Sequence, residues 1–364
     1  MREALPSLSH EHTRIDSPGA RIDAVALTFG ENIGPRAFKQ LVAVYGSASQ
    51  ALLSTYTARE RTNLRSTAEA ALETGRKAGA TFLLIGDADY PAKLYELHDP
   101  PPYLFTLGNL AVLERPCVAV VGTRRATAYG EWATTNIVEP VAAAGVCIVS
   151  GMARGIDAAA HRAALSAGGT TVGVLGTGVD VAYPVGHRAL HRTIADRGLL
   201  VSEFPCGAHA TRGSFPRRNR IIAALASLTI VIEAPVESGA MITEAYATDL
   251  GRDVGAVPGP INSPQSAESN KLIQSGAHTI LHSNDVLSLL GISTKSAPQL
   301  ELKLGADEQA VWNALEHAIT PMDMLADRLA LPTNRVLAAV TGLEVRGLLE
   351  TLPTGELRRR RLSS

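Results

Sequence analysis

The segment Val120-Val-Gly-Thr-Arg-Arg125 decides the fold, because it joins the β-branched run Val118–Val121 to a turn that carries Gly, Thr and Arg. Two further segments repeat this design: Val149-Ser-Gly-Met-Ala-Arg-Gly-Ile-Asp157 and Glu237-Ser-Gly-Ala-Met-Ile-Thr-Glu244. Such a loop at the carboxyl end of a strand presents backbone N–H groups and a helix N-terminus, which bind anions. A glycine at a strand end can serve a tight turn alone, but three such loops favour a phosphate-binding crevice.

Between residues 79 and 292, short apolar runs alternate with Ala-rich amphipathic segments. The runs expected to be strands are Thr81–Ile85, Val118–Val121, Val146–Val149, Thr171–Leu175, Leu199–Ser202, Leu228–Ile232 and Val254–Val257. This alternation is typical of units in which helices connect parallel strands. The sequence therefore predicts an α/β fold over residues 79–292, with a Rossmann-like, doubly wound and mostly parallel sheet.

The flanking regions have different patterns. Residues 1–20 are polar and aperiodic and are expected to be a disordered tail, whereas apolar residues recur at helical spacing over 21–78 and predict a small helical domain. Residues 293–306 are polar and contain Pro298, as in a linker. Residues 307–361 show three helical patterns and then two strand-like runs, which is the order of a winged helix.

The composition excludes several classes of protein. Hydrophobic residues make up 46% and charged residues 19% of the 364, which argues against wholesale disorder. The net charge of −1 does not by itself indicate a nucleic-acid or membrane partner. The chain has no apolar run long enough to span a bilayer and no signal peptide, so we expect a cytoplasmic protein without a membrane partner. Its three cysteines form no C-x-x-C pair and are expected to be buried free thiols.

No metal or cofactor site is expected. The pairs His187/His191 and His278/His282 have the spacing of metal ligands but lack the Glu of an H-E-x-x-H helix. No loop matches G-x-x-x-x-G-K-[ST] or an intact G-x-G-x-x-G, which disfavours an ATPase or an ordinary NAD enzyme. Asp157 and His161 lie four residues apart, so acid–base chemistry is conceivable. More often such an Asp stabilises a helix N-terminus and the nearby His forms a hydrogen bond with it.

A local basic segment runs from Phe204 to Ile232 and contains no Asp or Glu. It carries Arg212, Arg217, Arg218 and Arg220, with Phe215 and Asn219 between them. Arginines for phosphates and an aromatic ring for base stacking are what a single-stranded nucleic-acid site needs. The alternative is a solvated arginine-bearing loop with Phe215 in the core.

The motifs resemble those of the DNA-processing protein A (DprA/Smf) family. The strings that carry the resemblance are VGTR at 121–124, SGMARGIDAAAH at 150–161, YP at 183–184, SEFP at 202–205, FPRRNRIIA at 215–223, ESGAMITEA at 237–245 and LIQSGA at 272–277. The resemblance implies an extended Rossmann-like domain, flanked by a sterile-alpha-motif-like helical domain and a winged helix. It also implies a non-enzymatic, homodimeric protein that binds and protects single-stranded DNA and loads the RecA recombinase onto it during natural transformation.

The nucleic-acid-binding residues that we expect lie in the matching strings or close to them. They are Gly122, Thr123, Arg124, Ser150, Gly151, Arg212, Phe215, Arg217, Arg218, Asn219, Arg220, Ser238, Gly239 and Thr243. The resemblance implies that Arg124 contacts phosphates and that Arg212 and Phe215 are the basic and base-contacting pair. The three glycines of the loops would let the backbone approach the strand.

Two other functions remain open at this point. A nucleotide phosphoribohydrolase would use Glu244, with Asp157 or Arg154, on a glycosidic bond. A transcription regulator would use the C-terminal winged helix on duplex DNA, although winged helices also bind proteins.

Overall fold

The computed structural model describes residues 18–211, 213–292, 304–315, 320–346, 348–351 and 356–359. The chain divides into two compact units, Met1–Thr294 and Lys295–Ser364. The division falls within the segment 293–306 that the sequence indicates as a linker, most of which lies outside the described residues.

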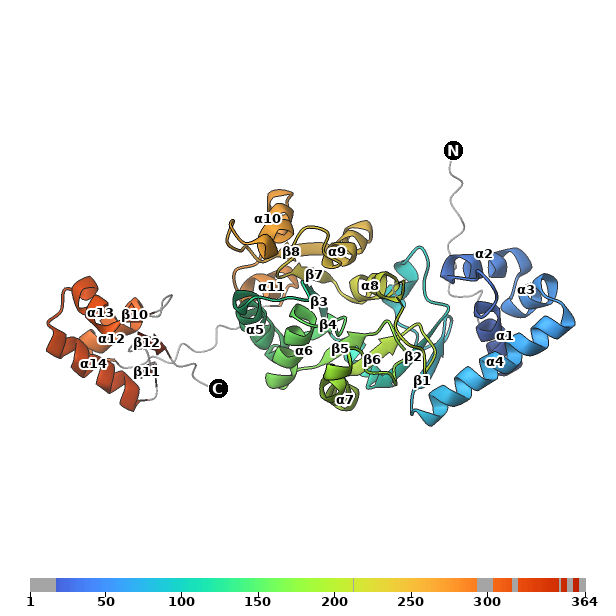
Figure 1. Ribbon diagram of the computed structural model, residues 1–364, viewed down its shortest axis with the longest axis horizontal. Helices are drawn as coiled ribbons and strands as arrows, with labels where there is room; N and C mark the ends of the chain where they lie inside the picture. The colour runs from blue at the N-terminus through green and yellow to red at the C-terminus, as the bar shows by residue number, and fades with distance from the viewer. Residues whose placement is uncertain are drawn as a thin grey trace. The chain divides into compact units, whose positions relative to one another are not determined.

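The larger unit is built on a nine-stranded sheet with the order β1-β2-β6-β5-β4-β3-β7-β8-β9 (Figure 1). Its strands are β1 (Thr81–Leu84), β2 (Tyr103–Gly108), β3 (Cys117–Val121), β4 (Cys147–Ser150), β5 (Thr171–Val174), β6 (Leu199–Ser202), β7 (Leu228–Val231), β8 (Asp253–Ala256) and β9 (His278–Thr279). The neighbours from β6 to β9 are parallel, whereas β2 pairs antiparallel with both β6 and β1. The predicted Rossmann-like, mostly parallel fold is confirmed.

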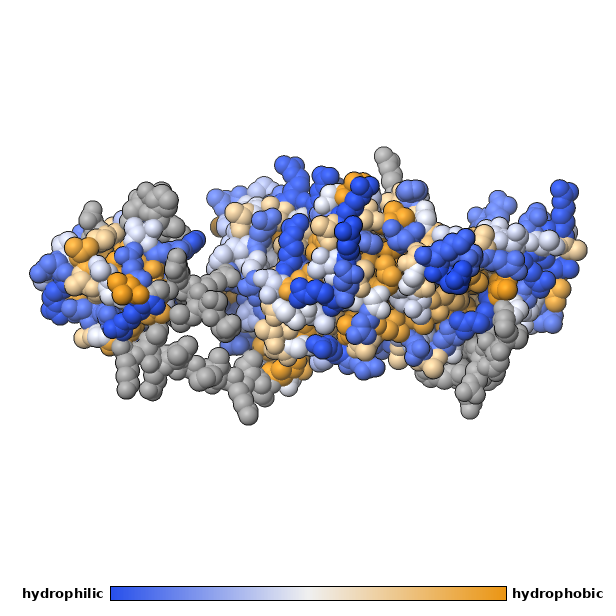
Figure 2. Space-filling view, turned by 90° about the horizontal axis from the view of Figure 1, so that it is seen from below, coloured by the Kyte–Doolittle hydropathy of each residue, from blue (hydrophilic) through white to orange (hydrophobic). Residues whose placement is uncertain are grey.

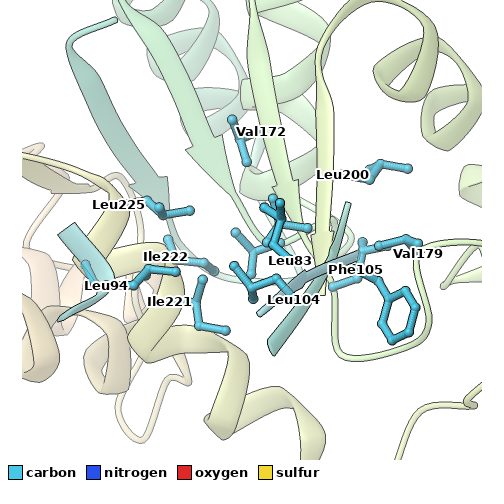
Figure 3. Packing of buried hydrophobic residues seen from close by; sticks show 14 of the residues in the cluster. Leu83, Leu94, Leu104, Phe105, Val172, Val179, Leu200, Ile221, Ile222 and Leu225 are labelled. Carbon is cyan, nitrogen blue, oxygen red and sulfur yellow. The ribbon is translucent and has the colours of Figure 1, made fainter. Parts of the chain in front are cut away.

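The strands in the middle of the sheet are buried on both faces, which explains why they read as continuous apolar runs. In β3, Val118 and Val120 belong to one core cluster, and Ala119 and Val121 belong to the other. Figure 3 shows side chains of the larger cluster from β1, β2, β5, β6 and the helix Ser214–Leu225 gathered in one place.

Helices cover both faces of the sheet (Figure 1). The helices of this α/β part are α5 (Ala128–Ala143), α6 (Ile156–Ser166), α7 (Arg188–Arg197), α8 (Ser214–Leu225), α9 (Ala240–Asp249), α10 (Ala267–Gln274) and α11 (Ser283–Leu289), with 3-10 turns η1 (Ala92–Glu96), η2 (Leu110–Glu114), η3 (Val185–His187) and η4 (Pro264–Ser266). Residues of α5 and α11 pack in the cluster with Val118 and Val120, whereas those of α8 pack with Ala119 and Val121. The chain therefore winds in both directions from β3.

The seven expected strands all form, with ends that differ from the expected ones by no more than one residue. Two strands of this nine-stranded sheet were not predicted. The strand β2 follows three prolines and lies antiparallel between β1 and β6, so it breaks the alternation of strand and helix on which the prediction relied. The strand β9 has only two residues, too few to show a period.

The N-terminal part is helical, as expected: α1 (Pro18–Thr28), α2 (Pro35–Tyr45), α3 (Ala48–Thr55) and α4 (Ala58–Lys77). Since α1 begins at Pro18, residues 18–20 are helical and do not belong to a tail. Ion pairs tie these helices together and to the α/β part: Arg65 to Asp23 at 2.5 Å and Arg21 to Asp87 at 2.5 Å.

The smaller unit contains α12 (Ala306–Ala314), α13 (Met322–Leu329), α14 (Thr333–Val345) and a sheet of β10 (Thr320–Pro321), β11 (Leu349–Thr351) and β12 (Glu356–Arg359) in the order β10-β12-β11. Three helices followed by an antiparallel pair of strands confirm the predicted winged helix. The expected turn Pro353–Gly355 lies outside the described residues.

Hydrophobic and hydrophilic residues are mixed on the face that Figure 2 shows. Among the described residues, no helix combines the length and the apolar character that crossing a membrane requires.

Candidate functional site

A groove of about 670 Å³ lies at the carboxyl ends of the central strands. It is lined by residues Val121–Arg125, Ala153, Asp157, Tyr183, Ala210, Thr211, Phe215, Pro216, Arg218, Asn219, Ile222, Pro235, Ser238–Ala240, Ile242 and Thr243. Its walls include the segments that follow β3, β4 and β7, and β3 and β7 are the neighbours between which the strand order reverses. Ligands of doubly wound folds bind at this switch point, so this groove is the candidate site.

The loop after β3 is fixed by its neighbours and leaves Arg124 exposed. The backbone N–H of Thr123 donates to the carbonyl of Glu233 at 2.7 Å, and the Thr123 hydroxyl accepts from the N–H of Arg125 at 3.1 Å. At Gly122 a Cβ would lie 2.6 Å from Cγ1 of Ile156. Gly122 is therefore required by the packing of α6 against the loop, and the expected role in backbone approach to a ligand does not explain it.

The side chain of Phe215 contacts a cation and a second ring in the lining of the groove. The guanidinium carbon of Arg124 is 5.1 Å from the centroid of the Phe215 ring, and the Tyr183 ring centroid is 5.4 Å away. Phe215 is partly exposed and lines the groove, so it is not a core residue. Arg124 thus pairs with the Phe215 ring, whereas the expected pair of Arg212 and Phe215 stays a prediction because Arg212 lies outside the described residues.

Arg218 is a buried part of the wall, only 5% exposed. Its guanidinium donates to the carbonyls of Gly151 and of Val174, the latter at 3.0 Å, and lies 3.6 Å from Oδ2 of Asp157. A Cβ at Gly151 would collide with this guanidinium, so the glycine makes room for Arg218. Burial raises the pKa of Asp157 and Arg218 opposes the rise. Arg218 and Gly151 bind each other, and Arg218 lines the groove, so their contact with nucleic acid stays a prediction.

Ser150 is also part of the wall. It is fully buried, and its hydroxyl donates to the carbonyl of Val120 at 2.6 Å, so it ties β4 to β3. The burial of Ser150 does not support its expected contact with nucleic acid, which stays a prediction.

Two arginines of the basic segment are bound to a carboxylate within the protein, so they are less available to a phosphate than the sequence suggests. Arg220 is 1% exposed and donates to Oε2 of Glu203 at 2.6 Å. This burial does not support its expected contact with nucleic acid, which stays a prediction. Arg217 is exposed but donates to the same oxygen at 3.2 Å, and its guanidinium lies over the Phe204 ring. Burial raises the pKa of Glu203, and the two arginines oppose that rise. Glu203 stands one residue before the segment that the charge pattern singled out, which is how it was missed.

The loop after β7 and the start of α9 form the opposite wall. The Asn219 amide donates to the carbonyl of Gly239 at 3.2 Å, and Thr243 is 1% exposed. The backbone N–H of Ala240 donates to the Ser238 hydroxyl at 3.3 Å. A Cβ at Gly239 would meet no atom within 4 Å, so this glycine leaves an open side toward the groove.

The remaining predicted residue, Arg212, lies outside the described residues. Its neighbour Thr211 lines the groove.

The residues of an acid–base mechanism are not brought together. Asp157 accepts a hydrogen bond from the N–H of Ala153 at 3.1 Å. His161 is bonded through Nδ1 to the Thr171 hydroxyl at 2.7 Å, so the expected bond to Asp157 is wrong. Burial, with a smaller contribution from Arg218, lowers the pKa of His161 to about 3. Glu244 accepts from Thr248 at 3.0 Å and does not line the groove.

The structure adds residues that the prediction lacked. A second cavity of about 350 Å³ adds Arg154 to the candidate site. It shares six lining residues with the groove: Arg124, Arg125, Ala153, Tyr183, Phe215 and Arg218. The string YP at 183–184 is one of the matching motifs, but its sequence alone indicates no role for Tyr183.

In the winged helix, the arginines of α14 and of its C-terminal cap are held by acidic partners. Arg335 pairs with Asp307 at 2.6 Å, and Arg346 pairs with Glu308 at 3.3 Å. The large exposed hydrophobic residues of this helix are Leu337 and Val345. Such a face does not resemble one that reads base edges in duplex DNA.

Comparison with known proteins agrees with this architecture. The sequence profile of the DNA recombination-mediator protein A family matches residues 81–291, and that of the DprA winged helix domain matches residues 295–355. Protein Smf of Synechocystis sp. is 44% identical over 227 residues, which are 60% of this chain and 56% of that protein. The chain thus spans little more than half the length of this relative.

Two solved structures are similar. DNA processing protein A of Streptococcus pneumoniae has a TM-score of 0.61 and 34% identity, over 77% of this chain and 94% of that one. The Helicobacter pylori protein, whose structure is described as giving insights into its single-stranded DNA binding mode, has a TM-score of 0.53 and 29% identity, over 58% of this chain and 97% of that one. Because the family profile covers more than half of the chain, the protein belongs to the DNA recombination-mediator protein A family.

Proposed function

We propose that this protein binds single-stranded DNA in the groove at the carboxyl ends of β3, β4 and β7, without catalysing a reaction. The observation that carries the proposal is the stacked Arg124 and Phe215 at the edge of the groove. A guanidinium binds phosphate and stacks on rings, and a phenyl ring stacks on any base, so the pair suits a strand of any sequence. The single-stranded DNA binding mode described for the H. pylori relative supports the same function.

Within this proposal, Gly239, Ser238, Thr243 and Asn219 form the wall that faces Arg124, and Gly122 and Thr123 hold the loop that carries it. Arg217 of α8 contributes less positive charge to the groove than a free arginine, because its ion pair with Glu203 partly neutralises it. The hydrolase hypothesis has no comparable support, because Glu244 lies away from the groove lining.

The test is fluorescence anisotropy with a labelled oligo-dT and a duplex of equal length over a salt series. If about four phosphates are neutralised, log K should fall with log salt at a slope of about −3. Arg124→Ala should weaken binding at least about tenfold and make the slope shallower, and Phe215→Ala should weaken it about 5- to 150-fold. Arg162→Gln, an exposed arginine of α6, is the matched control and should change nothing.

No preference for the single strand, or a preference that both variants retain, would contradict the proposal. Hydrolysis of nucleotides would then be assayed next.

The wider part of the proposal is that the bound strand is handed to RecA during transformation or recombination in the cytoplasm, by a homodimer. Its support is the family membership. The test is the lag time of RecA filament formation on single-stranded DNA that is coated with a single-strand-binding protein. We expect wild-type protein to shorten the lag and Arg124→Ala to leave it unchanged; equal lags with and without wild-type protein would exclude loading.

A further inference from the structure

Beside the groove lies the second cavity of about 350 Å³, here called the second lobe. It is lined by Arg124, Arg125, Gly151–Arg154, Leu175–Thr177, Tyr183, Pro184, Phe215 and Arg218. Six residues line both cavities: Arg124, Arg125, Ala153, Tyr183, Phe215 and Arg218. Among them, Phe215 contacts both Arg124 and Tyr183, and these three side chains are here called the partition. Both volumes are within the range of about 300–1,000 Å³ that is usual for sites of small organic groups.

The partition offers a second stacking surface besides Phe215. The guanidinium of Arg124 already lies over the Phe215 ring, at 5.1 Å from its centroid. Tyr183 keeps 45% of its surface exposed, and its ring is inclined by 40° to that of Phe215. A base that enters the second lobe therefore finds the Tyr183 ring at its wall.

The charge of the second lobe suits a polyanion. Its lining contains Arg124, Arg125, Arg154 and Arg218, and none of the described residues that line it is acidic. Arg218 is buried against Asp157 and the strand ends, whereas Arg124, Arg125 and Arg154 are exposed. Three accessible guanidinium groups around one aromatic wall match the chemistry of a nucleotide within a strand, with its base on the ring and its phosphates on the cations.

We propose that the second lobe is a second nucleotide site, in which Tyr183 stacks a base and Arg154 and Arg125 neutralise phosphates. The strand then crosses the partition at Arg124 and Phe215 and continues from the groove into the second lobe. This proposal rests on the proposed function, since it assigns further residues to the same single-stranded DNA.

The first experiment measures the affinity of the full-length protein for oligo-dT by anisotropy. Tyr183→Ala should weaken binding about 5- to 150-fold, whereas Tyr183→Phe, which keeps the ring, should stay within about twofold of wild type. Tyr45→Ala, an exposed tyrosine of α2, is the control. Arg154→Gln should make the salt slope shallower by about 0.7, and Arg162→Gln should not.

A double-mutant cycle separates a stacking role of Tyr183 from a merely supporting one. If each ring holds its own base, the losses from Tyr183→Ala and Phe215→Ala add in the double variant. If Tyr183 only supports Phe215, its loss disappears in the Phe215→Ala background, and the proposal is overturned.

Wild-type affinity and salt slope in Tyr183→Ala and Arg154→Gln, while Arg124→Ala and Phe215→Ala bind weakly, would also overturn it and leave the proposed function standing. Wild-type behaviour of all four variants would overturn the proposed function itself. Circular dichroism and thermal unfolding of each variant identify any loss that comes from misfolding.

Discussion

Single residues of the wall divide into those that hold the fold and those that face the groove, and the glycines show the division. A Cβ at Gly122 would lie 2.6 Å from Ile156 and 2.9 Å from the carbonyl of Glu233, whereas a Cβ at Gly239 would meet nothing within 4 Å. Gly239 also has a φ of −61°, which any residue adopts.

We therefore expect Gly122→Ala to reduce the free energy of unfolding by about 1–3 kcal/mol, because the added methyl group overpacks the contact with α6. Gly239→Ala should leave the free energy of unfolding unchanged within about 0.5 kcal/mol. Urea unfolding followed by circular dichroism compares the two variants with wild type. An equal loss of unfolding free energy in the two variants would show that the close contact of Gly122 with Ile156 does not limit the stability of the loop.

His161 should make stability depend on pH. The Thr171 hydroxyl donates to the carbonyl of Ile148 at 2.7 Å, so Nδ1 of His161 is the donor to Thr171. Burial lowers the pKa of His161 to about 3, so the ring is neutral near pH 7. The pKa of His161 is about 3 in the folded protein and about 6.5 in the unfolded chain. Between these two values His161 is protonated only in the unfolded chain, so the folded state loses stability as the pH falls below about 6.5.

Between about pH 7 and about pH 5 the wild type should lose about 2 kcal/mol more than His161→Gln, a value that follows from one proton over about 1.5 pH units. The measurement is the urea midpoint at both pH values. A parallel loss in the two proteins would exclude His161 as the cause.

At the scale of elements, α8 is held in place by buried charge. Arg220 of α8 reaches Glu203 after β6 at 2.6 Å and Asp99 at 3.5 Å, and Arg218 of the same helix reaches the ends of β4 and β5. The helix thus carries Phe215 at its first turn and is anchored within the next two turns.

Glu203→Ala should destabilise the larger unit by about 3–5 kcal/mol, because it leaves the Arg220 guanidinium buried without its closest carboxylate. Glu73→Ala, which removes an exposed ion pair of α4, is the comparison and should leave the unfolding midpoint unchanged. Thermal unfolding of both variants checks this. An unchanged midpoint in Glu203→Ala would mean that α8 is anchored by its apolar contacts alone.

The elements were easier to predict than the site. Continuous apolar runs such as those of β3 and β7 are visible without any knowledge of contacts, because both of their faces are buried. The availability of Arg218 and Arg220 was not visible, because their partners Asp157 and Glu203 lie outside the basic segment and meet it only in the folded sheet. Tyr183 was missed for the same reason: it reaches Phe215 across 32 positions of sequence.

At the scale of the whole molecule, the smaller unit has no net excess of positive charge. From Lys295 to Ser364 there are nine Lys and Arg and nine Asp and Glu, so its formal charge is zero. Its core, which includes Val311, Leu325 and Val340, is separate from those of the larger unit.

A chain that ends at Ile292 should therefore bind oligo-dT within about twofold of the full-length affinity, which corresponds to about 0.4 kcal/mol. The same anisotropy titration measures it, with Arg124→Ala in the short chain as the control. A loss of tenfold or more on removal of the smaller unit would place part of the DNA site there.

The groove is made from five stretches of sequence that are far apart, and their separation sets the order in which the groove can form. Its walls come from residues within 121–125, 153–157, 210–222 and 235–243 and from Tyr183, and β3 must pair with β7, which starts about a hundred residues later. Contacts of such large sequence separation form late, since the intervening chain must first be ordered. A growing chain on the ribosome therefore holds no complete groove until α9 has emerged.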